Sequence, residues 1–450
     1  PAPYSIYEDI YKLEPGSIIK LKLPFSDIKN VEIQSYWSIK EAAKRGQENP
    51  FTGTREEAAD ELERLLKESI SEQMMADVPV GAFLSAGIDS STVVALMQSL
   101  NRGKVKTFTI GMAEKDYDEA VYAKEIARHL GTEHTELYIT EADAQAVIPK
   151  LADMFGEPFA DSSQIPTYLV SEMTRKHVTV SLSGDGGDEL FCGYTSYASV
   201  ERIWNKMKGI PYFIRKPCSE MVLHSPLVRK PVYQVKGKLL GAKGPSDLYI
   251  ASLETEPLAG KIGFTDGGCS YKYSEYQPDY LKEPCHNIML MDMLMYHPDD
   301  ILVKVDRTAM AVSLETRVPM LDKDVVEFAW SLPVDYKRQL RMGNLAAGEG
   351  ISGNQDFLGK KVLRDVLYRY VPKEMMERPK KGFSVPVDKW LRQPGLRAWA
   401  EELIERRNLE RQGLLNPDVV WKIWSDFIDR GQWRIQIWYI LMFQEWMRQS

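Results

Sequence analysis

The most informative stretch of this chain is residues 78–98, VPVGAFLSAGIDSSTVVALMQ. Apolar and small residues from Val80 to Leu84 predict a short strand that is buried on both faces. The mostly apolar run from Val93 to Met97 predicts the packing side of a helix that follows. Such a strand-turn-helix presents unsatisfied backbone N–H groups at the helix N-terminus, where the helix dipole favours negative charge. The turn between them therefore predicts a phosphate site.

The side chains of this turn suit a nucleotide. Ser85, Ser90 and Ser91 offer hydroxyl donors to phosphate oxygens, and Asp89 offers a carboxylate to the Mg²⁺ that accompanies nucleotide phosphates. The turn is not a Walker A loop, because no Lys follows Gly87, and the dinucleotide pattern G-x-G-x-x-G is absent. The alternative interpretation is an ordinary strand-to-helix turn capped by serines.

Composition narrows the class of protein. With 450 residues, 44% hydrophobic and 27% charged, the chain is expected to be globular and to form two or three domains. A net charge of −7 argues against nucleic acid as a partner, because phosphate-backbone binders carry a basic face. The four cysteines stand at unrelated spacings and predict neither a disulfide framework nor a zinc site. No apolar run approaches the roughly 20 residues that span a bilayer. We therefore expect no membrane partner and a cytoplasmic location.

Three regions are predicted along the chain. Residues 1–37 contain short alternating stretches, typical of the end of a β-rich unit. Residues 38–200 alternate strands and helices as a parallel sheet requires, and residues 201–450 are mainly helical. Aromatic residues of the final segment are expected to form helix–helix core. In the middle region we expect strands at 105–111, 135–138 and 178–182, and helices at 54–75, 118–130, 141–154 and 165–175, the first of them capped by Thr54 and Glu57.

A second glycine-rich turn, Ser183 to Glu189, follows the predicted strand at 178–182. Ligands of open parallel sheets bind outside the carboxyl ends of the strands, so this turn is expected on the same rim as the Ser85 turn. Asp89 and Asp188 would then share a metal ion. The alternative is a flexible Gly-Asp turn with solvated charges.

Several motifs together resemble a known family. SAGIDS (85–90) resembles the pyrophosphate loop S-G-G-x-D-S of enzymes that cleave ATP between the α and β phosphates. Ala86 stands at the usual first glycine, where a methyl group is tolerated at negative φ and strained at positive φ. In order along the chain, the motifs resemble the synthetase domain of the glutamine-hydrolysing asparagine synthetase family over about residues 1–445. The other motifs are SGDGGDELFCGY (183–194), LVKVDR (302–307), LETRVPMLD (314–322) and RPKKGFSVP (378–386).

The resemblance implies a fold and a partner. The fold is α/β: a parallel sheet with an ATP site of the pyrophosphate-loop, adenine nucleotide α-hydrolase-like type, followed by a largely helical C-terminal part. Residues 1–37 correspond to the last strands of the family's N-terminal glutaminase domain. The body of that domain, with its nucleophilic cysteine, is not in this sequence, so glutaminase activity is not expected of this chain. A separate glutaminase domain or subunit is the implied partner, and a homodimer is left open.

The resemblance also implies a reaction. A substrate carboxylate attacks the α-phosphate of ATP and releases pyrophosphate, and ammonia then displaces AMP from the acyl-adenylate, with Mg²⁺ as the implied cofactor. The acceptor is left open among aspartate, other carboxylates on sugars or peptides, and an acid that closes a β-lactam ring intramolecularly. The competing class is a non-catalytic homologue that binds nucleotide, motivated by Ala86, Asp185 and the missing glutaminase body.

Site residues are carried over by position. Lys380 corresponds to the family's catalytic lysine at the α-phosphate, although a Lys380-Lys381 pair by itself is usually a solvated loop. Asp185 stands where the family usually has Glu, with an expected role toward the acceptor or ammonia. Glu315 and Arg317 are expected either to face the acceptor or ammonia or to tie helices together. The implied ATP-binding residues are Leu84, Ser85, Ala86, Gly87, Asp89, Ser90, Ser91, Ile110, Ser183 and Gly184, the implied metal ligands are Asp89 and Asp188, and residues 341–356 are expected to form a mobile loop over the site.

Overall fold

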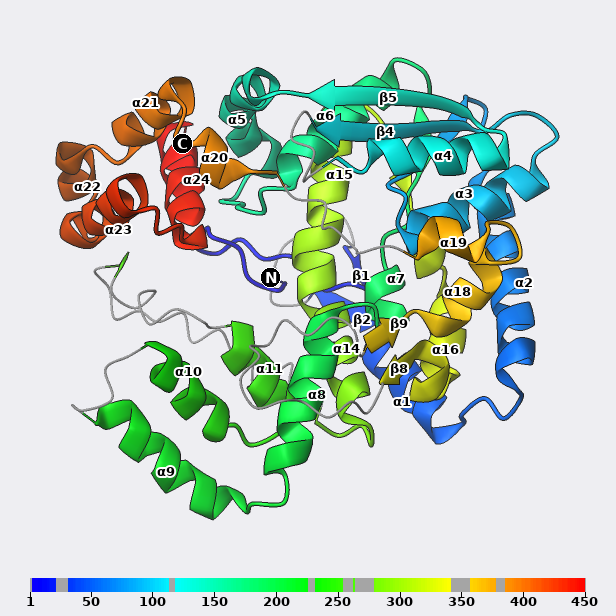
Figure 1. The fold of residues 1–450 in the computed structure, drawn as a ribbon, viewed down its shortest axis with the longest axis horizontal. Helices are drawn as coiled ribbons and strands as arrows, with labels where there is room; N and C mark the ends of the chain where they lie inside the picture. Colours follow the sequence, from blue (N-terminus) through cyan, green and yellow to red (C-terminus); the bar gives the residue numbers. More distant parts are fainter. Residues whose placement is uncertain are drawn as a thin grey trace.

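The α/β part is built on a parallel sheet of five strands in the spatial order β5-β4-β3-β6-β7. Figure 1 shows its strands β4 and β5 with the helices α4, α5 and α6 beside them. The structure, a computed structural model, describes residues 2–21, 31–112, 118–225, 231–253, 262–263, 279–340, 357–377 and 385–449. All pairings within this sheet are parallel, which confirms the predicted fold class. The strands are β3 (Val80–Phe83), β4 (Lys106–Met112), β5 (Glu133–Ile139), β6 (Val180–Leu182) and β7 (Glu315–Arg317).

The strand order reverses between β3 and β6. The chain moves from β3 outward to β4 and β5, and then returns to place β6 on the other side of β3. In open α/β sheets, ligands bind at the carboxyl ends of the strands where the order reverses in this way. The two glycine-containing turns predicted to carry the chemistry follow β3 and β6, so the topology places both at this point.

Helices connect the strands with bounds close to those predicted. The first begins at Thr54, whose hydroxyl accepts from the Glu57 N–H while the Glu57 carboxylate accepts from the Thr54 N–H, as the predicted capping box requires. These helices are α2 (Arg55–Gln73), α3 (Ile88–Leu100), α4 (Ala120–Leu130), α5 (Glu141–Phe155) and α6 (Gln164–Arg175).

Two clusters of buried apolar side chains hold the sheet. Leu84 and Leu182 belong to a cluster with residues of α2 and α3. Phe108 and Ile110 belong to the other cluster, together with residues of α5 and α6. Both clusters also contain side chains from beyond residue 200, so the helical part completes both cores. The proposed division of the chain at residue 200 stays a prediction.

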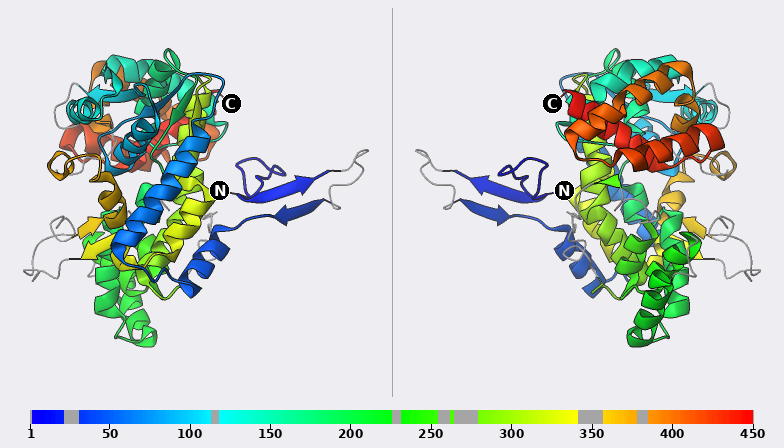
Figure 2. Two further views of the ribbon diagram at one scale, coloured as in Figure 1. Left: turned by 90° about the vertical axis from the view of Figure 1, so that its right-hand side faces the viewer. Right: turned by 90° about the vertical axis from the view of Figure 1, so that its left-hand side faces the viewer.

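Further helices surround this frame in Figure 1, and a hairpin projects from it in Figure 2. The hairpin pairs β1 (Ser17–Lys20) with β2 (Glu32–Ser35) in antiparallel register. A second small antiparallel pair joins β8 (Arg338–Leu340) to β9 (Phe357–Gly359). The further helices are α1 (Ile39–Glu48), α7 (Gly187–Leu190), α8 (Thr195–Met207), α9 (Tyr212–His224), α10 (Pro231–Leu240), α11 (Pro245–Leu253), α14 (Pro284–Leu294), α15 (Leu302–Met310), α16 (Lys323–Ser331), α17 (Val334–Lys337), α18 (Lys361–Leu367) and α19 (Lys373–Met376).

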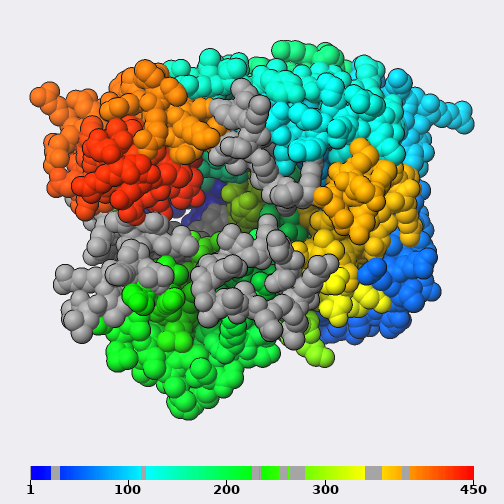
Figure 3. Space-filling model, in the orientation of Figure 1, coloured from blue at the N-terminus to red at the C-terminus, as the bar shows by residue number. Residues whose placement is uncertain are grey.

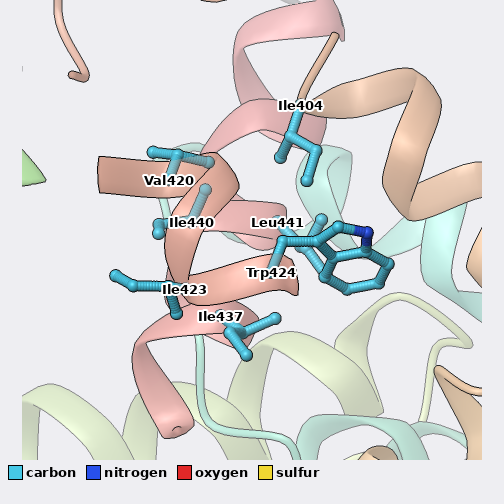
Figure 4. A pocket seen from close by; sticks show the side chains of 7 residues that line it. All are labelled: Ile404, Val420, Ile423, Trp424, Ile437, Ile440 and Leu441. Carbon is cyan, nitrogen blue, oxygen red and sulfur yellow. The ribbon is translucent and has the colours of Figure 1, made fainter. Parts of the chain in front are cut away.

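The C-terminal helices pack around aromatic side chains, as the sequence predicts. Trp424, Phe427 and Trp438 are buried, and a small apolar pocket lies beside Trp424, lined by six isoleucine, valine and leucine side chains (Figure 4). None of the helices in the described ranges is long and apolar enough to cross a membrane. The C-terminal helices are α20 (Val387–Trp390), α21 (Pro394–Leu403), α22 (Arg406–Gln412), α23 (Pro417–Arg430) and α24 (Ile435–Gln449).

Candidate active site

The turn after β3 is held by its own serines. The Ser85 N–H donates to Ser90 Oγ at 3.1 Å, and the two hydroxyl oxygens of these residues lie 2.9 Å apart. Gly87 is the N-cap residue of α3 and has no side chain to cap the first turn. The first N–H groups of α3 point toward the end of the sheet, where the helix dipole favours an anion.

Ala86 has a φ of 57°, within the left-handed region. This is the conformation in which the sequence predicts strain for a residue with a Cβ. The methyl group is 2% exposed and belongs to the first apolar cluster, so its burial offsets part of that strain. The backbone of the loop thus has the positive φ that favours glycine, although an alanine occupies it.

The turn after β6 touches the first turn directly. A Cβ built on Gly184 would lie 2.5 Å from the Ser90 nitrogen, and one built on Gly187 would lie 2.3 Å from Asp89 Oδ1. Such distances are far shorter than any allowed contact, so only glycine permits this approach. The structure therefore places the two turns on one rim of the sheet, as expected from the order of the strands.

Lys360 joins the two predicted metal ligands. Its ammonium group contacts Asp89 Oδ2 and lies 2.8 Å from Asp188 Oδ1. The Lys360 side chain is only 5% exposed, and those of Asp89 and Asp188 are each 17% exposed. Burial disfavours the charge of Lys360, but the two carboxylates outweigh it and raise the pKa of this lysine above its usual value. The sequence gives no reason to select Lys360. Residues 359–361 (Gly-Lys-Lys) contain the same residue types as residues 380–382 (Lys-Lys-Gly), where the catalytic lysine is expected.

The residues present fit a divalent cation. Asp89 and Asp188 come from different turns, and their carboxylate oxygens converge on the same positive group. Carboxylate oxygens are the ligands that Mg²⁺ prefers, and two carboxylates with one ammonium leave an excess negative charge at this point. Metal binding by these two residues remains a prediction that this geometry supports.

Asp185 faces its own turn. The Ser183 hydroxyl donates to Asp185 Oδ2 at 2.7 Å. Burial raises the pKa of Asp185 above its usual value, while the Ser183 hydrogen bond and the positive charge of Lys304 act in the opposite direction. The positive charge of Lys304 therefore influences the protonation of Asp185.

A second charged group lies near Asp185, and sequence reasoning gave it no role. Lys304 at the start of α15 donates to Asp161 at 2.7 Å, and Asp161 also accepts from the N–H and hydroxyl of Ser163. Burial and the neighbouring Asp161 charge raise the pKa of Asp300 to about 7. The LVKVDR motif contains Lys304, but its partner Asp161 is distant in sequence, so only the fold reveals the pair.

Two buried carboxylates with tyrosine partners lie behind the second turn. The Tyr194 hydroxyl donates to Glu189 at 2.7 Å, and burial raises the pKa of Glu189 to about 8. The hydroxyls of Tyr197 and Tyr249 both donate to Asp292, whose pKa burial raises to about 6. These pairs fix α8, α11 and α14 around the turn.

Glu315 and Arg317 make contacts away from this cluster. Arg317 Nε lies 2.7 Å from Glu315 Oε1, and Arg317 Nη1 donates to the main-chain oxygens of Gln73 and Met75. Gln73 ends α2, which precedes β3, so these contacts tie the helix to β7. They favour the structural alternative that the sequence left open.

The other predicted nucleotide residues are largely buried beneath the rim. Leu84 and Ile110 are 1% and 7% exposed, and Ser183 donates its N–H to the Arg317 main-chain oxygen. Ser91 is fully buried, and its hydroxyl has no hydrogen-bond partner within the described ranges. Lys380 and the predicted loop at 341–356 lie outside the described residues. The space-filling view in Figure 3 shows the C-terminal helices (red) and the α8–α10 region (green) on the same face of the molecule.

Comparisons with known proteins identify the family of this chain. The family model described as asparagine synthase matches residues 61–448. "Asparagine synthetase [glutamine-hydrolyzing] 1" of Bacillus subtilis is 29% identical over 99% of this chain and 66% of its own length. A putative asparagine synthetase of Mycobacterium bovis is 31% identical over 89% of this chain and 58% of its own length, and one of Methanocaldococcus jannaschii is 33% identical over 69% and 58%.

This chain therefore spans at most 66% of the length of these relatives. The family match, in contrast, covers both turns, the Lys304 segment and Lys360. The site at the end of β3 and β6, with its two glycine-containing turns, accordingly lies within a chain that belongs to the asparagine synthase family.

Proposed function

We propose that this chain is a carbon–nitrogen ligase that uses ATP to amidate a carboxylate through an acyl-adenylate. The products would be AMP and pyrophosphate, with ammonia as the nitrogen donor. One observation carries the proposal: the turns that follow β3 and β6 bring Asp89 and Asp188 together around Lys360, the N-cap residue of α18, at the point where the strand order reverses. The names of the relatives support aspartate as the acceptor.

The chain's own groups suit the departing pyrophosphate. In this proposal the N–H groups at the start of α3 and the hydroxyls of Ser85 and Ser90 hold its oxygens. In this proposal the Lys360 ammonium leaves the two carboxylates and binds phosphate oxygens, since an ammonium group forms charge-assisted hydrogen bonds with carboxylates and phosphates alike. Asp89 and Asp188 would hold Mg²⁺, which when bound supplies neutralisation of the pyrophosphate charge.

The acceptor side of the proposal rests on the second charged group. Lys304 is paired with Asp161, and its positive charge acts on Asp185. An amino-acid acceptor has an ammonium and a carboxylate group, to which carboxylates and a lysine of this kind are complementary. We propose that Asp185 and this pair orient the acceptor. Lys380 is proposed to stabilise negative charge at the α-phosphate in both half-reactions. The contacts of Glu315 and Arg317 support a positioning role for these two residues.

The N-terminal hairpin supports a partner that supplies ammonia. Ile18, Ile19 and Ile33 on the hairpin are 44%, 43% and 60% exposed. Ile19 and Ile33 are paired across the two strands and share one face, whereas Ile18 lies on the other. Exposed apolar side chains paired on a projecting hairpin are typical of a surface that another domain covers. The relatives are named glutamine-hydrolysing and are longer than this chain. We propose that a glutaminase domain or subunit packs on this hairpin and that this chain alone uses free ammonia.

The reaction products test this proposal. The chain is mixed with ATP, Mg²⁺, ammonium and a panel of acids, and AMP, ADP, pyrophosphate and phosphate are quantified. We expect AMP and pyrophosphate in equal amounts with aspartate and ammonium present. ADP with phosphate would exclude adenylation, whereas pyrophosphate release with another acid alone would change the acceptor and keep the mechanism.

A further inference from the structure

Two buried cysteines lie side by side behind the ATP-site turn. The Sγ atoms of Cys192 and Cys285 are 3.0 Å apart, and both side chains are 0% exposed. Cys192 follows α7 and has a φ of 57°, whereas Cys285 is the second residue of α14. These elements are far apart in the sequence, so the fold creates a thiol pair that the cysteine spacing does not predict.

The surroundings favour a thiolate at Cys285. It lies in the first turn of α14, where the helix dipole stabilises negative charge. The two sulfurs share one hydrogen bond, and Cys285 Sγ also donates to Met289 Sδ at 3.8 Å. The contact with Cys192 and the nearby Arg338 guanidinium lower the pKa of Cys285, while burial raises the pKa of Cys192. Lys337 adds a fully buried ammonium group that has no hydrogen-bond partner within the described ranges. The position of Cys285 in the first turn of α14 therefore favours it as the cysteine that reacts first.

The residues on both sides of Cys192 lie against Asp188 and Lys360. A Cβ built on the next residue, Gly193, would lie 2.0 Å from Asp188 Oδ1 and 2.2 Å from Lys360 Cε. The Lys360 N–H donates to the main-chain oxygen of Phe191 at 2.9 Å. A movement at Cys192 therefore reaches Asp188 and Lys360 through directly packed atoms.

We propose that Cys192 and Cys285 form a redox modification site: a peroxide converts them into a reversible disulfide that weakens the ATP site. The Cys285 thiolate attacks a peroxide oxygen, so that an S–O bond forms, the O–O bond breaks and, after protonation, water leaves. The Cys192 sulfur then attacks the sulfenic sulfur of Cys285, so that the S–S bond forms and the S–O bond breaks with loss of a second water. The two thiols lose two electrons and the peroxide gains them.

Closing the pair alters the turn that carries Asp188. A disulfide bond is about 2.05 Å long, so the sulfurs must approach by roughly 1 Å. Misplacement of reacting groups by about 1 Å can lower a rate by about 100-fold. The loss of turnover rests on the proposed function, whereas the disulfide itself and the loss of ATP affinity do not require turnover.

Peroxide treatment followed by alkylation and mass spectrometry tests the pair. We expect one cross-link between the peptides of Cys192 and Cys285, removed by dithiothreitol. Cys285→Ser and Cys192→Gly should both abolish it, and the second variant suits the positive φ at this position. Cys218→Ser, at an exposed cysteine, is the matched control and should keep the cross-link. Oxidation of Cys218 without a Cys192–Cys285 cross-link would overturn the proposal.

The effect on the site is measured on the same samples. Affinity for ATP with Mg²⁺ should fall on oxidation and return on reduction, and pyrophosphate release should fall by up to about 100-fold. An oxidised, cross-linked chain that binds ATP as the reduced chain does would overturn the coupling. Failure of the reduced chain to release pyrophosphate would count against the proposed function alone, because the cross-link and ATP affinity are scored separately.

Discussion

At the scale of single residues, Lys360 is the group on which the site depends. It is a nearly buried ammonium between two carboxylates that would otherwise repel one another. Removing one partner of a buried ionic group leaves uncompensated charge, which typically costs about 3–5 kcal/mol. Loss of the Lys360 ammonium should therefore change both the stability of the fold and the charge of the candidate site.

Lys360→Met should therefore lower the free energy of unfolding by about 3–5 kcal/mol. Added Mg²⁺ should restore part of the loss, because it supplies positive charge to the same carboxylates. Urea denaturation with and without Mg²⁺ measures both effects. The neighbouring Lys361→Met is the matched control, since Lys361 is partly exposed and donates to the Asp335 main-chain oxygen. Equal stability of the two variants would contradict this role of Lys360.

Ala86 shows two opposing effects of similar size. Left-handed backbone costs an alanine about 1–2 kcal/mol, whereas burial of its methyl group returns about 0.8 kcal/mol and glycine loses more chain entropy on folding. Ala86→Gly should accordingly change the free energy of unfolding by less than about 1 kcal/mol. Ala86→Val should destabilise the fold clearly, because a β-branched residue is poorly accommodated at positive φ. Thermal denaturation separates the two variants, and a tolerated valine would show that φ is not positive here.

At the scale of elements, the two turns approach each other closely because glycines, which have no side chain, stand at the points of contact. Gly187 has no space for a Cβ beside Asp89, and Gly184 has none beside Ser90. Gly187→Ala should displace the Asp89 carboxylate and lower pyrophosphate release by about 100-fold, the effect of a misplacement near 1 Å. Gly103→Ala is the control, because nothing lies within 4 Å of a Cβ there. Similar activity of both variants would mean that the turns do not meet as described.

The packing of α8, α11 and α14 around Asp292 predicts a dependence on pH. Burial raises the pKa of Asp292 to about 6 in the folded chain, above the value of about 4 in an unfolded chain. The folded state therefore binds more protons between these values, and stability falls as pH rises from about 4 to about 6. Asp292→Asn should remove about 2–3 kcal/mol of this fall, since each pKa unit corresponds to about 1.4 kcal/mol. Urea denaturation across this range should show the difference, and parallel profiles would contradict it.

Prediction from the sequence succeeded where the signals are local. The capping box of Thr54 and Glu57, the alternation of strands and helices, and the order of the motifs are all readable along the chain. Lys360, Asp161 and the Cys192–Cys285 pair could not be found in this way, because each acts through a residue distant in sequence. The sequence leaves both signs of φ open at Ala86, and the backbone of the structure shows that φ is positive.

At the scale of the whole molecule, both apolar clusters join the parallel sheet to the helices beyond residue 200. Lys304 and Lys360, which lie on or beside those helices, reach the rim only because the helices pack on the sheet. The projecting β1–β2 hairpin extends away from this body (Figure 2). In the proposed function, the chemistry takes place at the rim, and a glutaminase domain or subunit on the hairpin supplies the ammonia.

Isotope transfer shows whether an acyl-adenylate forms at the rim. Aspartate labelled with ¹⁸O in its side-chain carboxylate is turned over with ATP, Mg²⁺ and ammonium, and the nucleotide product is examined by mass spectrometry. If the carboxylate attacks the α-phosphate and ammonia then displaces AMP, one labelled oxygen must remain on the phosphate of AMP. Label found in inorganic phosphate together with ADP, or AMP formed without label, would show that the carboxylate does not attack the α-phosphate.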